Sequence, residues 1–247
     1  VFLKLGAFYE FYNQHDLAAL NYENSLSRTD DIVQSNKLVL KIVNQYTLAK
    51  LPNRSISTLN KYESAFLKLT KARASEGASF FRKQVSFYEA YGDAYYEKQL
   101  SDSAVYYYTL ADELSNEKGF VDANTAIKLK LAKVYGDNNE KIEYQYLNQA
   151  KVQSVNTTNQ NLQIESETQL ANYYRKNDFT SKEIKARNNI IEELDKLTGK
   201  SEVVDYDIRS RKLEEQVNIA KTLNLSDDYD DALKVLQEID IVLNDAD

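Results

Sequence analysis

A pattern of small residues and tyrosines recurs along the chain and constrains its fold more than any other feature. Gly6 and Ala18 are twelve residues apart, and Gly92 and Ala104 repeat this spacing. In both copies a tyrosine follows the glycine by three residues and another follows the alanine by four. Weaker copies put the period near 40 residues, which is typical of stacked helical hairpins. We therefore predict an all-α protein, a right-handed α-solenoid of about six antiparallel hairpins.

We predict that these hairpins form a single domain, residues 1–247, because no Gly-, Ser- or Pro-rich linker divides the chain. The expected hairpins span 1–28, 32–72, 78–116, 122–154, 162–197 and 203–245. Apolar residues recur at helical spacing in each of them. In the first helix these are Leu3, Leu5, Phe8 and Tyr12.

Polar turns divide the helices of each hairpin. We expect Asp16 and Ser55 to cap the helices that follow the first two turns, because their side-chain oxygens can accept from free backbone N–H groups. Pro52 is the only proline, and it should end the helix before it because it disfavours helical geometry in the preceding residue.

The small residues and the tyrosines have a structural interpretation. Glycine or alanine at the repeated positions lets two helix axes approach closely, and a tyrosine ring then fills the remaining space. This explains most of the 19 tyrosines without a ligand. Tyr106 and Tyr107 fit the apolar stripe less well, and we expect them to be exposed.

Composition excludes several classes of function. The net charge of −7 disfavours nucleic acid as a partner. No apolar run is long enough to cross a membrane, and the absence of cysteine excludes disulfides and zinc–thiolate sites. The chain starts and stops within expected helices, which is typical of a piece of a longer protein.

No group of residues predicts catalysis. His15 is the only histidine, and its place in the turn 13–16 favours a solvated loop residue. The glycines form no phosphate-binding pattern. The acidic run at 227–231 lacks the glycine and final glutamate of a calcium loop, so a helix start is favoured there. We expect no enzymatic activity, no cofactor and no metal.

These residues resemble the tetratricopeptide repeat (TPR) family. The residues that carry the resemblance are Leu5, Gly6, Tyr9, Ala18 and Tyr22 in the first hairpin and Tyr91, Gly92, Tyr95, Ala104, Tyr108 and Ala111 in the third. Partial forms lie around Ala132, Ala171 and Ala232. The proline that usually closes each repeat of the family is absent.

The resemblance implies a binding groove on the first helix of each hairpin. The residue after the small position faces this groove in the family, and residues one helical turn on add further contacts. Ala7 holds the first such position. The other implied groove residues are Asn44, Asp93, Tyr96, Lys133, Asn172, Arg175, Lys176 and Lys221.

The resemblance also implies a function. The chain is similar to TPR regions of bacterial signalling proteins, and we expect a non-enzymatic module that binds a peptide or protein partner as a sensor or scaffold region of a sensor kinase or transcriptional regulator. A purely structural assembly scaffold and an intracellular peptide-pheromone receptor remain alternatives. A homodimer is compatible with this interpretation. The periplasmic side of a membrane sensor is favoured over the cytoplasm.

Overall fold

The computed structural model describes residues 1–29, 31–72, 77–136, 138–198 and 202–244. Within these ranges the chain forms twelve α-helices and no strand. The helices are α1 (Phe2–Phe11), α2 (His15–Leu26), α3 (Ile32–Leu48), α4 (Pro52–Ala72), α5 (Ala78–Glu97), α6 (Ser101–Glu117), α7 (Val121–Tyr135), α8 (Glu140–Ser154), α9 (Gln160–Lys176), α10 (Thr180–Asp195), α11 (Glu202–Leu225) and α12 (Tyr229–Asn244).

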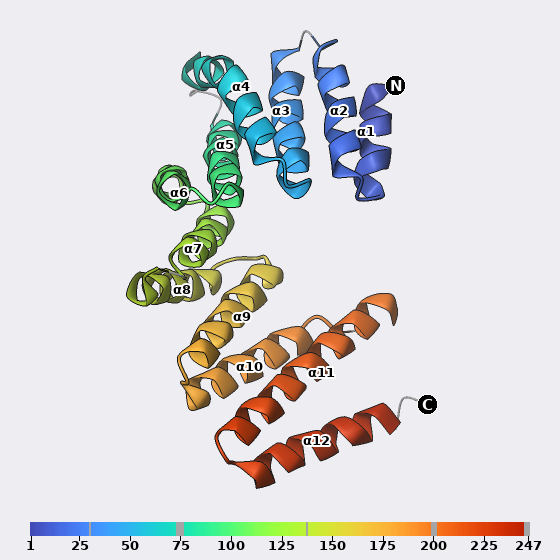
Figure 1. Ribbon diagram of the computed structural model, residues 1–247, viewed down its shortest axis with the longest axis vertical. Helices are drawn as coiled ribbons and strands as arrows, with labels where there is room; N and C mark the ends of the chain where they lie inside the picture. The colour runs from blue at the N-terminus through green and yellow to red at the C-terminus, as the bar shows by residue number, and fades with distance from the viewer. Residues whose placement is uncertain (30, 73–76, 137, 199–201, 245–247) are drawn as a thin grey trace. The chain divides into compact units, whose positions relative to one another are not determined.

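The helices form two compact units, Val1–Asn138 and Asn139–Asp247. In the first unit, α1 to α7 each pack on the next helix, and α3 also contacts α5 and α5 contacts α7 (Figure 1). In the second unit, α8 to α12 pack in the same consecutive manner. The chain is thus an all-α helical repeat protein. The boundary falls between the two helices of the fourth expected hairpin, and the single continuous array remains a prediction.

The same turn closes five of the hairpins. In each of these hairpins, the residue two positions after the end of the first helix has a positive φ. These residues are Asn13, Lys50, Gln99, Asp178 and Asp227. The backbone N–H of the following residue then donates to a carbonyl five residues back, at 2.8–3.0 Å. This is the Schellman arrangement, which satisfies carbonyls that a helix end leaves free. In four of the five turns that carbonyl belongs to a tyrosine, at positions 9, 46, 95 and 174.

Close helix contact explains why two helix positions are glycine. A Cβ atom built on Gly92 would lie 2.3 Å from Cδ1 of Tyr108, and one on Gly6 would lie 2.5 Å from Cε1 of Tyr22. Both rings are buried, and each hydroxyl donates to a carboxylate of the facing helix. The repeated Gly–Tyr pattern is therefore a helix contact without room for a methyl group.

Some residues expected in the core are exposed. Leu3, Leu5 and Phe8 of α1, and Tyr12 just after it, are exposed, and only Gly6 of this helix is buried. They follow the expected helical spacing but stay exposed, because α2 is the one described helix that packs extensively on α1. Tyr107, which the sequence predicts to be exposed, is instead half-buried, and its ring stacks on Tyr91 with ring centroids 4.4 Å apart.

The two expected helix caps are also wrong. Asp16 lies inside the first turn of α2, after the cap residue Gln14. Ser55 lies within α4, which begins at Pro52, and its buried hydroxyl donates to the Val43 carbonyl at 3.2 Å. Proline suits this first helical position because the N–H that it lacks would have no partner there.

His15 is not a solvated loop residue. It is the first residue of α2 and half-buried, and its Nδ1 lies 2.8 Å from Oε1 of Gln45 on α3. Gln45 is itself buried and donates to Glu10 on α1 at 3.0 Å. His15 thus belongs to a polar contact that joins three helices.

A pair of alanine substitutions tests this packing. Ala104 is fully buried on α6, whereas Ala7 is exposed on α1. We expect Ala104→Leu to lower the free energy of unfolding by about 1–3 kcal/mol because the added atoms have no space. Ala7→Leu is the matched control and should change it by less than about 0.5 kcal/mol. Equal urea midpoints for the two variants would contradict the assigned helix contacts.

Candidate functional site

A hollow opens on the first helices of the second, third and fourth hairpins, within the first unit. Its volume is about 140 Å³. The residues that line it are Thr47 on α3, Asp93, Tyr96 and Glu97 on α5, Tyr108 on α6, and Lys130 and Lys133 on α7. Six of these seven side chains lie on first helices, which is the side where the groove is expected.

The floor of the hollow is a charged cluster. Lys130 reaches from α7 to α5, and its Nζ lies 2.7 Å from Oδ1 of Asp93 and 2.7 Å from Oε1 of Glu89. The Tyr108 hydroxyl donates to the same Asp93 oxygen at 2.7 Å. These contacts join α5, α6 and α7 and hold the Asp93 carboxylate in place.

Burial and charge act in opposite directions on this cluster. Burial alone lowers the pKa of Lys130, but the charges of Glu89 and Asp93 outweigh it and hold that pKa above its usual value. Burial, followed by the charge of Asp93, raises the pKa of the Tyr108 hydroxyl. Both groups therefore keep their protons at neutral pH, and Lys130 is a permanent cation already occupied by two carboxylates.

The upper edge of the hollow differs from its floor. Glu97 is paired with Lys50 at 2.8 Å. Lys133 is exposed, and its Nζ lies 5.0 Å from the centre of the Tyr96 ring. Among the side chains that the structure describes, no carboxylate forms an ion pair with Lys133. Lys133 is thus a cation available to an anionic group of a ligand, with an aromatic ring beside it.

Three of the implied groove residues come together here, namely Asp93, Tyr96 and Lys133. Asn44 is exposed one helical turn before Thr47 on α3 and lines no part of the hollow. Sequence reasoning missed Lys130. A signal was present, because Glu89 and Asp93 are four residues apart and share one face of α5.

The other four implied residues lie in the second unit. Asn172 and Lys221 are exposed on α9 and α11. Lys176 is also exposed, and its Nζ lies 3.4 Å from Oε2 of Glu143. Arg175 has a different role, because its Nε pairs with the buried carboxylate of Glu183 at 2.8 Å. A single groove that includes both sets remains a prediction.

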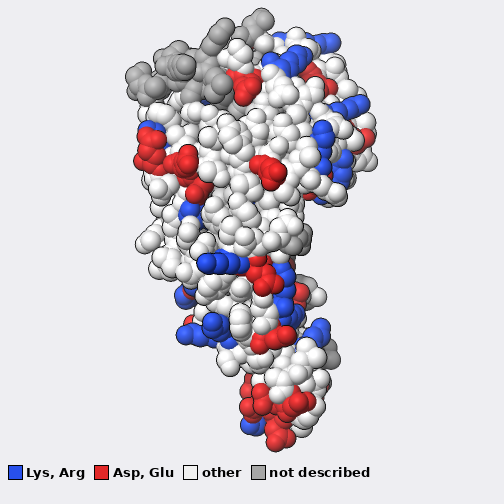
Figure 2. Space-filling model, turned by 60° about the vertical axis from the view of Figure 1, so that its left-hand side comes forward, with Lys and Arg blue, Asp and Glu red and all other residues white. Residues whose placement is uncertain are grey.

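The described residues include no group of three His, Asp or Glu side chains that could hold a metal ion. None of the described helices is both long and apolar enough to cross a membrane. On the face drawn in Figure 2, Lys and Arg lie among Asp and Glu, and the described residues form no broad basic patch there.

Comparison with known proteins identifies the fold. No family model matches the sequence, and no curated protein matches it. Solved structures do match. A signal transduction ATPase with a tetratricopeptide repeat sensor, from Pyrococcus horikoshii, is 12% identical with a TM-score of 0.73, and the match covers 98% of this chain and 35% of that one. The chain thus spans about a third of that protein.

Two further solved structures have a similar fold. BtubC from P. vanneervenii is 15% identical over 92% of this chain and 90% of that chain, with a TM-score of 0.63. A Rap protein complexed with Competence and Sporulation Factor is 13% identical over 99% of this chain and 74% of that chain, with a TM-score of 0.64. At such low identity these likenesses concern the fold alone, and they confirm the TPR-like repeat fold expected from the sequence.

Proposed function

We propose that the chain is a non-enzymatic TPR-like module that binds a peptide or protein partner in the first-helix hollow of its first unit. An acidic side chain or a terminal carboxylate of the partner lies against Lys133 and the Tyr96 ring. The observation that carries this proposal is the difference between Lys130 and Lys133, two of the three lysines on α7. Lys130 is occupied by Glu89 and Asp93, whereas Lys133 has no carboxylate among the described side chains.

The setting of Lys133 favours this role. The floor below it is held by ion pairs between α5 and α7, so the hollow exists before a ligand arrives. Helical repeat proteins use such extended surfaces to bind other chains. One of the similar structures, the Rap protein, was solved with a bound factor.

A peptide selection tests the proposal. Decapeptides of random sequence are displayed and selected on the whole chain, and the affinities of the recovered peptides are measured by fluorescence anisotropy. We expect acidic peptides, and a loss of about threefold or more for Lys133→Gln, because an exposed ion pair contributes up to about 1 kcal/mol. Tyr96→Ala should weaken the same peptides.

The matched control is Lys98→Gln, which removes an exposed lysine from the turn after α5, outside the hollow. It should leave the affinity unchanged apart from a small long-range charge effect that added salt removes. Peptides that bind Lys133→Gln and Lys98→Gln equally well would place the binding site elsewhere and contradict the proposal.

We further propose that this module is the sensor or scaffold region of a bacterial signalling protein. One similar structure is described as a tetratricopeptide repeat sensor within a signal transduction ATPase. An intracellular peptide-pheromone receptor and a structural assembly scaffold are the alternatives. The complete gene tests this directly, because a sensor requires an output module such as a kinase or a DNA-binding domain encoded in the same protein.

A further inference from the structure

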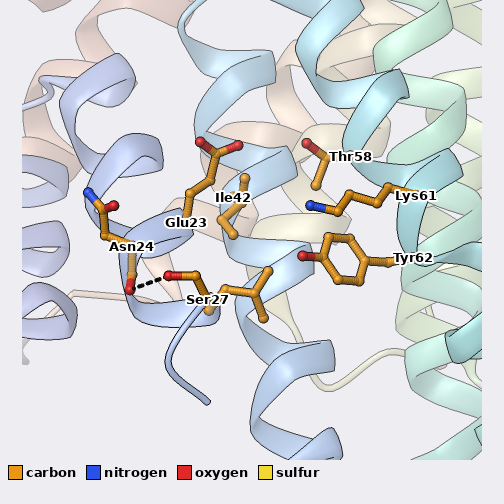
Figure 3. A pocket seen from close by; sticks show the side chains of 8 residues that line it. Glu23, Asn24, Ser27, Ile42, Thr58, Lys61 and Tyr62 are labelled. Atoms are coloured by element: carbon orange, nitrogen blue, oxygen red, sulfur yellow. Dashed lines mark hydrogen bonds between the residues drawn. The ribbon is translucent and has the colours of Figure 1, made fainter. Parts of the chain in front are cut away.

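A second, larger pocket lies on the other helices of the first two hairpins. Its volume is about 310 Å³, at the lower end for small-molecule sites. It is lined by Glu23, Asn24, Leu26 and Ser27 at the end of α2, Ile42 on α3, and Thr58, Lys61 and Tyr62 on α4 (Figure 3). It shares no residue with the hollow around Lys133.

The α2 side of this pocket is negative. Glu23 lies in the last turn of α2, where the helix dipole adds partial negative charge. That turn contains no basic residue. Arg28, just beyond it, lies over the Phe2 ring of α1 with its Cζ 4.5 Å from the ring centre. Among the described residues no lysine or arginine pairs with Glu23.

Glu23 lies close to a buried tyrosine. Burial, followed by a hydrogen bond to Glu23, raises the pKa of the Tyr46 hydroxyl. Tyr46 is buried on α3, next to the pocket. A carboxylate has two oxygens, and the contact with one hydroxyl leaves acceptor capacity for a ligand.

The α4 side of the pocket is positive. Figure 3 shows the Lys61 ammonium and the Tyr62 hydroxyl directed into the pocket from α4. The Nζ atom of Lys61 lies 5.2 Å from the Tyr62 ring centre, and no described carboxylate pairs with it. Between the two sides, Leu26 and Ile42 form an apolar floor and are themselves buried.

We propose that this pocket binds a small apolar zwitterion. The ligand's ammonium group lies against Glu23 and the end of α2, its carboxylate lies against Lys61 with the hydroxyls of Tyr62 and Thr58 as further donors, and its apolar side chain covers Leu26 and Ile42. Free apolar amino acids and short apolar peptides share this chemistry. Since α2 and α4 belong to successive hairpins, a bound ligand bridges them and favours one packing of the first hairpin on the second.

The test is a titration of the whole ¹⁵N-labelled chain with L-leucine and with leucyl-leucine, followed by NMR. We expect saturable shifts of backbone amides at the end of α2 and in α4 around residues 58–62 for at least one of the two ligands. The single-charge analogues 4-methylpentanoate and 3-methylbutylamine should bind at least about threefold more weakly, as expected from the loss of one exposed ion pair.

Two variants check the assigned contacts. Lys61→Gln should weaken the zwitterion at least about threefold and leave the affinity for 3-methylbutylamine unchanged. Glu23→Gln should also weaken the zwitterion at least about threefold, and it should leave the affinity for 4-methylpentanoate unchanged. Lys98→Gln, an exposed lysine in the turn after α5, is the control. No shifts at these helices with either zwitterion would overturn the proposal, and so would single-charge analogues that bind as tightly as L-leucine. The comparison with the single-charge analogues uses the unmodified chain, so it tests the proposal even where a variant fails to fold.

Discussion

Replacement of Arg187 by methionine is expected to destabilise the second unit by about 3–5 kcal/mol, the largest effect of any single substitution that we propose. Arg187, on α10, is only 1% exposed. Its Nε donates to Glu183 at 2.8 Å and its Nη1 to Glu215 of α11 at 2.6 Å. Both carboxylates are buried. The variant therefore leaves two buried anions with one remaining cation, Arg175, which reaches Glu183.

Hydrogen exchange of the amides in α10 and α11 is the suitable measurement, because helical repeat proteins do not always unfold in one step. Lys185→Met is the matched control, since Lys185 is exposed two residues away on the same helix, and it should change stability by less than about 0.5 kcal/mol. Adding Glu183→Leu and Glu215→Leu to Arg187→Met should recover most of the loss, because no unpaired charge then stays buried. A change below about 1 kcal/mol for Arg187→Met would show that the charges are hydrated.

Gly92→Ala is expected to destabilise the third hairpin by about 3 kcal/mol, at the upper end for an overpacked core. The usual effect inside a helix has the opposite sign, since alanine is favoured over glycine by about 1 kcal/mol. Here the new Cβ atom would lie 2.3 Å from the Tyr108 ring. The ring cannot swing aside without breaking its hydrogen bond to Asp93.

A double-mutant cycle separates this clash from other effects. Tyr108→Leu removes the ring, so Gly92→Ala should cost much less in that background than in the unmodified chain, with a coupling of about 1–3 kcal/mol. Urea unfolding followed by circular dichroism provides the four stabilities. A Gly92→Ala variant as stable as the unmodified chain would mean that α5 and α6 move apart freely.

The helical hairpins could be predicted because their signal is local. Helical spacing of apolar residues, polar turns and Pro52 all act over a few residues, and they predict the all-α chain that the described residues show. The Gly–Tyr spacing could be recognised for the same reason, since Gly92 and Tyr108 face each other across one short turn.

Only some of the implied groove residues lie together in the structure. Asp93, Tyr96 and Lys133 lie together because first helices of neighbouring hairpins pack side by side. Which lysine is available to a ligand depends on distances between residues that are more than 30 positions apart in sequence, such as Lys130 and Asp93. Arg175 was implied as a groove residue, but it pairs with Glu183 of the next helix, and the sequence alone does not reveal this pairing.

The sequence by itself therefore determined that the chain is all-helical and which small positions bring two helices together, because these follow from spacing within one hairpin. Tertiary structure alone decided which apolar residues are covered, as the exposed Leu3 and Phe8 show. It also decided that His15 and Arg187 are structural, and that Glu23 and Lys61 face one pocket. The physical reason is that burial and the pairing of charges depend on which helices meet, and a hairpin's own sequence does not specify its neighbours.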